Sequence, residues 1–213
     1  MVSINLEDLK SWKRLSCIIS LFGGLQFIIV TFIAMFFYPD GYSFTEDYFS
    51  HLGTTVNIKT GSPNDISRFL FVMACIITGI CLIPFWIVIS TLFTASKLMK
   101  SLSSFGSFLG IISCPFLMGI GIFAGDTQHS LHVLSTRMFF LLFAAAILIY
   151  SIAILFNAEY QNIYSLIGIA FFILIVLFVL RFFIQINVIM QKIIVYGFCL
   201  WALLQITKIW KQL

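Results

Sequence analysis

The sequence predicts an all-α polytopic membrane protein, built as a six-helix transmembrane bundle with a short helix in an outer loop. Of its 213 residues, 61% are hydrophobic and 9% charged, and the mean hydropathy is +1.10. A soluble domain with this composition would lack the polar side chains to cover its surface. Six apolar segments approach the roughly 20 residues that a helix needs to cross a bilayer. Such long runs lack the alternation of membrane β-strands, so helices are expected.

The predicted spans form a single domain over residues 1–213. They lie near residues 15–37, 69–93, 105–123, 131–156, 163–180 and 188–206, with a long outer loop at 38–68. Pro84 and Pro115 are expected to kink the second and third spans. Gly106 and Gly110 stand four residues apart, which is typical of closely packed membrane helices. The five cysteines fall inside apolar segments and are expected to act as small core residues.

Basic residues predict the orientation of the chain. One set of loops and termini carries Lys10, Lys13, Arg14, Lys97, Lys100, Lys208 and Lys211. The opposite side carries fewer, namely Lys59, Arg68, Arg181 and Lys192. The positive-inside rule therefore predicts a multi-pass protein of the cell membrane with both termini in the cytoplasm. Because the basic residues mark segment ends and form no patch, nucleic-acid binding is not expected.

The outer loop contains the sequence SFTEDYFSHLG, which predicts a short helix. Ser43 and Glu46 have the spacing of a capping box, and Gly53 suits a left-handed stop. On this helix one apolar face would comprise Phe44, Tyr48, His51 and Leu52. His51 would then point towards the membrane. Further on, SPND predicts a helix start with Ser62 as its cap and Pro63 in the first position.

A second polar stretch, AGDTQHSLHVLSTR, opens the fourth span. Asp126 is expected to cap this helix at its N-terminus. His129 and His132 are three residues apart and share a face, and Thr136 lies a turn further along. The stretch falls on the predicted outer side. All three histidines of the protein are therefore expected at one membrane boundary.

Arg137 follows on the same helix, roughly 15 Å deeper than Asp126 at 1.5 Å per residue. An arginine at that depth is costly in lipid, so it is expected to face the bundle interior, a wet cavity or a bound anion. Snorkelling, or pairing with carbonyls at a helix end, is the alternative.

These residues suggest a lipid-directed hydrolase that depends on a metal. Three imidazoles from His51, His129 and His132 with an open fourth position are the ligand set of a catalytic zinc ion. Asp126 could orient a ligand or ligate, and the metal would activate water for attack on a lipid ester, amide or phosphoester. Ser50 could hold the oxyanion or assist a proton transfer.

Two other interpretations remain open, because the H-x-x-H spacing specifies only one turn of geometry. The protein could bind or sense a membrane lipid without a metal, in a polar cavity that includes Tyr48, Thr136 and Arg137. The polar residues could also be purely structural. Haem is less favoured because two of the three histidines share one turn, and transport because no chain of intramembrane acids is present. Membrane lipids are the expected partners; the sequence predicts no oligomeric state.

The segments YSFTEDYFSHLGTTVN…SPNDISRFLF and GIFAGDTQHSLHVLSTRMFF resemble two signatures of a prokaryotic multi-pass family of unknown function, numbered 998. The resemblance covers most of the chain and implies six spans. Its matched positions are Ser50, Leu52, Gly53, Gly125, Asp126 and either His132 or His129. His51 stands where that family usually has an acid. A fainter similarity is to the transmembrane ceramidases and progestin-type receptors, which are zinc hydrolases with three histidines, an aspartate and a serine.

Overall fold

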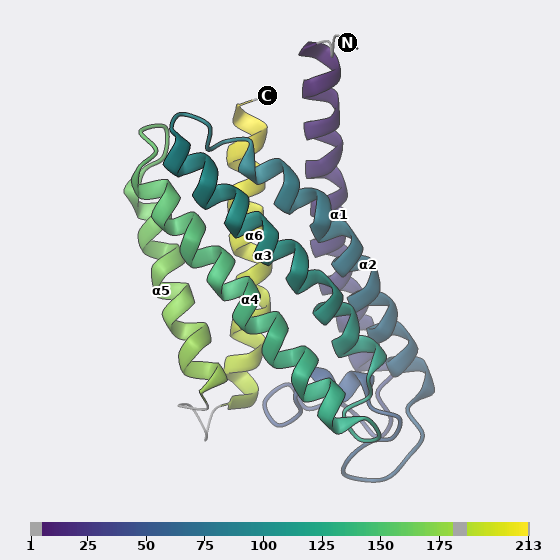
Figure 1. Ribbon diagram of the computed structural model, residues 1–213. Coiled ribbons are helices and arrows are strands. Elements are labelled where there is room, and N and C mark those ends of the chain that lie inside the picture. The colour runs from purple at the N-terminus through teal and green to yellow at the C-terminus, as the bar shows by residue number, and fades with distance from the viewer. Residues whose placement is uncertain (1–5, 181–186, 213) are drawn as a thin grey trace.

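The computed structural model describes residues 6–180 and 187–212 of the chain. They form six long helices and one short 3₁₀ helix, η1. These are α1 (Leu6–Phe36), η1 (Phe49–Gly53), α2 (Asp65–Ser90), α3 (Lys97–Ile122), α4 (His129–Leu155), α5 (Asn162–Val179) and α6 (Asn187–Lys211). Figure 1 shows both termini at one end of the bundle, which we call the terminal end. The α1–α2 loop and the α3–α4 turn lie at the opposite end, the loop end.

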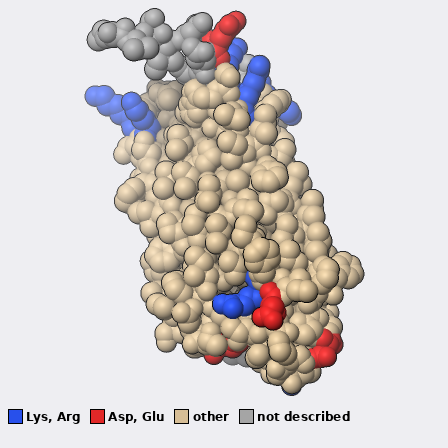
Figure 2. Space-filling model, turned by 90° about the vertical axis from the view of Figure 1, so that its right-hand side faces the viewer, with Lys and Arg blue, Asp and Glu red and all other residues tan. Residues whose placement is uncertain are grey.

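Each of the six helices is long and apolar enough to cross a membrane. The expected all-α membrane fold is therefore confirmed, and the chain is a multi-pass membrane protein. On the face in Figure 2 the acidic and basic side chains gather at the two ends, with an uncharged belt between them. Arg181, which the sequence placed on the outer side, lies outside the described residues.

Small residues set the closest helix contacts. A Cβ added at Gly110 would overlap the indole of Trp86 on α2, and one at Gly106 would lie 3.0 Å from Tyr150 on α4. Nearby, Ser107 shares a hydrogen bond of 2.6 Å with the Tyr150 hydroxyl and also donates to the Trp86 carbonyl. The two glycines thus seat α3 between α2 and α4, in the close-packing role expected of them. Pro84 and Pro115 both lie inside continuous helices.

The helix starts differ from two expectations. Helix α2 begins after Asn64 and not after Ser62, whose hydroxyl donates to Asp40. The Asn64 amide is committed to the carbonyls of Leu52 and Thr54, so it ties η1 to the start of α2. Helix α4 begins at His129 with Gln128 at its cap. The predicted capping role of Asp126 is therefore wrong, and that carboxylate has different partners.

The short helix of the loop is smaller than predicted. Regular structure covers only Phe49–Gly53, as a 3₁₀ helix, and the preceding residues form turns. The expected box between Ser43 and Glu46 does not form, because the Asp47 carboxylate accepts the Ser43 N–H at 2.8 Å. Within the loop Leu52 is fully buried, whereas Phe44 is 43% exposed.

Candidate functional site: a cavity capped at the loop end

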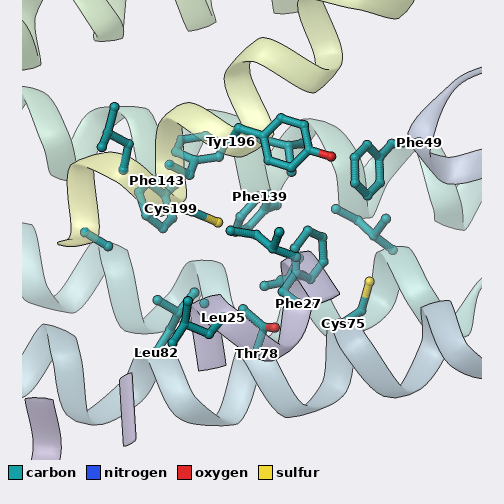
Figure 3. Close-up of a pocket in the computed structure, with 18 of the residues that line it drawn as sticks. Leu25, Phe27, Phe49, Cys75, Thr78, Leu82, Phe139, Phe143, Tyr196 and Cys199 are labelled. Atoms are coloured by element: carbon teal, nitrogen blue, oxygen red, sulfur yellow. The ribbon is translucent and has the colours of Figure 1, made fainter. Parts of the chain in front are cut away.

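An internal cavity of about 260 Å³ lies among α1, α2, α3, α4 and α6, with η1 at its loop end (Figure 3). Its walls are mainly aliphatic and aromatic, and include Phe27, Leu82, Phe139 and Phe143. All the side chains that line it are uncharged. Such a volume within a membrane-spanning bundle suits an apolar ligand.

The cavity reaches the surface of the bundle between α1 and α6. Leu21 and Leu25 of α1 line it and are 37% and 51% exposed. Leu200 and Leu203 of α6 line it from the other side and are 58% and 40% exposed. We call these four leucines the α1–α6 seam. Since both helices span the membrane, the seam faces the acyl chains of the bilayer.

At the loop end the cavity is closed by η1. Phe49 and Ser50 line this end, and the Phe49 ring stacks on Phe27 of α1 at 5.8 Å and meets Tyr196 of α6 edge-on at 5.8 Å. The Phe49 N–H donates to Gln191 Oε1 of α6 at 2.7 Å. The closure therefore depends on ring packing and on a backbone hydrogen bond to a buried glutamine.

A charged cluster lies in the loop above this closure. Asp47, whose side chain is only 3% exposed, is 3.1 Å from Lys59 Nζ and 3.4 Å from His51 Nδ1. Burial alone would raise the pKa of Asp47, but the Ser43 N–H and Lys59 reverse this and hold it below its usual range. The pKa of His51 is lowered because its burial outweighs the attraction of the Asp47 carboxylate. At neutral pH the cluster thus contains an ionised aspartate and a neutral histidine.

Lys192 of α6 connects the helix to this loop. It is 1% exposed, and its Nζ donates to the Asp47 carbonyl at 2.5 Å. The ammonium also lies 5.4 Å from the Tyr42 ring centroid and 5.1 Å from that of Phe44, within the range of cation–π attraction. These contacts fix the loop end of α6 to residues 42–47. We call the contacts of Gln191 and Lys192 with Phe49 and residues 42–47 the cap contacts.

The structure does not bring the three histidines together. His132 is buried and donates Nδ1–H to the Phe123 carbonyl at 2.8 Å, while His129 is exposed and pairs with the Gly125 carbonyl at 3.2 Å. His51 pairs with Asp47 in the loop. Among the described residues no group of three His, Cys, Asp or Glu side chains is placed to hold a metal ion. The zinc prediction therefore has no common ligand set in this geometry.

Asp126 links two loops at the loop end. Its Oδ2 accepts from the Thr55 N–H at 2.9 Å, from the Thr55 hydroxyl, and from the Val56 N–H at 3.3 Å. Burial would raise the pKa of Asp126, but these three donors lower it. The carboxylate therefore fixes the α3–α4 turn to the chain that follows η1.

The remaining predicted residues divide between the cavity and the surface. Ser50 and Thr136 line the cavity, and the Thr136 hydroxyl donates to the His132 carbonyl at 2.8 Å. The Tyr48 hydroxyl accepts from Asn187 of α6 at 3.1 Å, so Tyr48 helps to attach the outer loop to α6. Arg137 is exposed, which corrects the interior position expected for it. The described residues include no salt-bridge partner for it, and snorkelling along α4 stays a prediction.

Sequence reasoning missed four residues of this site: Asp47, Gln191, Lys192 and Tyr196. Lys192 carried a usable signal, because an ionisable side chain inside a predicted span is by default a candidate for function. Gln191, its neighbour, is also a polar residue within that span. Tyr196 and Asp47 carried none, since their roles depend on helices that are distant in sequence.

Fold and site together define a six-helix membrane protein with an apolar cavity that opens between its first and last helices. The family model described as "Protein of unknown function (DUF998)" matches residues 21–209. The chain belongs to this family, as its two polar motifs suggested. No curated protein matches the chain, and no solved structure matches it. The fainter similarity to the ceramidase superfamily stays a prediction.

Proposed function

We propose that this protein binds a membrane lipid, with the apolar chain of the lipid in the cavity and the η1 loop as its cap. The observation that carries the proposal is the cavity itself, an uncharged space whose α1–α6 seam faces the bilayer. A lipid could reach it sideways, without passing through water. This is the non-catalytic alternative raised by the sequence, in a cavity lined by two of the predicted residues, Ser50 and Thr136.

Gly24 provides the test. It lines the cavity, and a Cβ added there would have no heavy atom within 4 Å. A Gly24→Leu substitution should therefore place its side chain in the cavity, from a Cβ that meets no neighbour. Its matched control is Ile29→Phe, which adds bulk to a residue of α1 that is 56% exposed.

The assay is mass spectrometry of lipid that remains with the protein after purification in mild detergent. We expect wild type and Ile29→Phe to retain stoichiometric lipid and Gly24→Leu to retain several-fold less. Equal retention by all three proteins would place the lipid on the outer surface and refute the proposal.

Hydrolysis of a lipid by a zinc site stays a separate proposal, supported by the residue types alone. Elemental analysis of freshly purified, chelator-free protein tests it. Stoichiometric zinc that is lost in His132→Ala would support the enzyme, and its absence from the wild type would end that line of reasoning.

We also propose that both termini face the cytoplasm and that the loop end faces outward across the cell membrane. The support is the bias of basic residues towards the terminal end, which includes Lys10, Lys13, Arg14, Lys208 and Lys211.

A further inference from the structure

We infer that the bound lipid carries an uncharged group that accepts hydrogen bonds, such as an ester carbonyl or a hydroxyl, at the loop end of the cavity. Gln191, Tyr196 and Ser50 would hold this group. The inference rests on the proposed lipid binding and adds the chemical class of the ligand.

The cavity gives no counter-charge to an ionised headgroup. None of the side chains that line it is acidic, basic or a histidine. Two charges of the loop end already have partners there: Lys192 pairs with the Asp47 carbonyl, and the Asp47 carboxylate pairs with Lys59. A phosphate or carboxylate inside the cavity would be desolvated without compensation, which is strongly unfavourable. The polar group of the ligand is therefore neutral.

Gln191 supplies the most constrained donor. Its Oε1 accepts the Phe49 N–H, and since a backbone N–H can only donate, this bond fixes the orientation of the amide. The Nε2 group is then left with two N–H donors. Neither has a partner among the described residues, although Gln191 lines the cavity and is only 8% exposed. Because Gln191 lines the cavity, an acceptor on a bound ligand could pair with these donors.

Two residues that carry hydroxyl groups, Tyr196 and Ser50, line the same end of the cavity. The Tyr196 hydroxyl is buried and has no hydrogen-bond partner in the described structure, and Figure 3 shows it directed towards Phe49. Ser50 follows Phe49 directly, and its hydroxyl likewise makes no hydrogen bond within the described chain. Gln191 and Tyr196 are five residues apart on α6, or about 7.5 Å along its axis. An ester or hydroxyl placed between them could accept from more than one donor.

Two probes with identical tails test the inference: dioleoylglycerol, which is neutral, and dioleoyl phosphatidic acid, which is anionic. The full chain is delipidated in detergent and titrated with each, and complexes are counted by native mass spectrometry. We expect the neutral lipid to bind about tenfold more tightly or better, since no charged group of the cavity compensates the phosphate.

Tyr196→Phe is the decisive variant, because it removes a hydroxyl that has no protein partner to lose. It should weaken dioleoylglycerol binding by about 2- to 10-fold, the worth of one hydrogen bond, and leave the thermal stability of the lipid-free protein unchanged. Gln191→Glu keeps the acceptor for Phe49 and removes the donors, and should weaken the same probe.

The possible failures are distinguishable. If both probes bind equally and Gly24→Leu abolishes both, lipid binding stands and the neutral-group assignment is overturned. The assignment also fails if Tyr196→Phe leaves dioleoylglycerol binding unchanged. If Gly24→Leu leaves the binding of both probes at the wild-type level, the proposed function fails together with this inference.

Discussion

Two adjacent glycines of α1 provide a direct test of the cavity. Gly23 packs on α2, where an added Cβ would overlap Cys81 Cβ, whereas Gly24 faces the cavity and an added Cβ would have no heavy atom within 4 Å. Both are flanked by helix on either side. Replacing either with alanine should bring the same gain in helix propensity, about 1 kcal/mol. The difference in unfolding free energy between the two variants therefore measures the cost of overpacking at Gly23.

Overpacking of a well-filled contact typically costs about 1–3 kcal/mol, so Gly23→Ala should be less stable than Gly24→Ala by about that amount. The Gly23 carbonyl also accepts from Gln26 at 3.1 Å and from Thr78 at 3.1 Å, and separation of the helices would strain both bonds. Gly24→Ala itself should be as stable as wild type or more so.

The assay is equilibrium unfolding in mixed micelles, with thermal melts as a second measure. If Gly24→Ala loses as much stability as Gly23→Ala, the space beside Gly24 is filled in the native protein, and the cavity argument fails. If Gly23→Ala is neutral, the tight α1–α2 contact is wrong. Either result would be visible without knowledge of the ligand.

Three further predictions concern the loop end. Asp126→Ala removes three hydrogen bonds to residues 55 and 56 and should destabilise the attachment of this loop by about 1–3 kcal/mol. The loop should then be cleaved faster by trypsin after Lys59, and unchanged cleavage would contradict this prediction. The pKa of Asp47 is lowered in the folded protein, so its contribution to stability is complete above about pH 3.9, the unfolded value, and is lost as pH falls through the folded pKa. The melting temperature of Asp47→Asn should therefore fall less steeply with acid pH than that of wild type, and an unaltered pH profile would exclude this role. An impermeant thiol reagent added outside intact cells should label Ile58→Cys and not Leu98→Cys, both exposed positions; the reverse would invert the topology.

The fold could be predicted because the apolar composition of a segment is enough to identify a membrane-spanning helix. Each span requires a long apolar run, and hydropathy locates such runs without knowledge of their neighbours. The ends of the helices were harder to predict. Helix α1, for example, begins at Leu6 and includes charged residues that precede the apolar run. Helix α2 begins at Asp65, two residues later than the start predicted at Pro63. The Ser62 hydroxyl donates to Asp40, a contact between residues 22 positions apart that the local sequence does not indicate.

The site was harder to predict, because the scarcity of a polar residue in a hydrophobic sequence does not indicate its role. His129 and His132 stood out by their scarcity, yet each binds a carbonyl in or beside the turn before α4. The cavity is formed largely by α1 and α6, whose adjacency no local pattern encodes. Lys192 marked the right region, since a buried cation in a span needs a partner, and its partner is the loop.

The arrangement of the cap contacts also bears on the route by which the proposed lipid would enter. Gln191 and Lys192 are neighbours on α6, and they hold Phe49 and Asp47 of the same loop. Opening the cap would break both hydrogen bonds. Opening the α1–α6 seam requires only that leucine side chains exchange contacts with lipid tails. For the proposed lipid the second route should have the lower barrier, because lipid replaces the apolar contacts that are lost and no buried polar group is left without a partner. A lipid bound as proposed should therefore enter from the hydrocarbon of the bilayer while the cap stays closed.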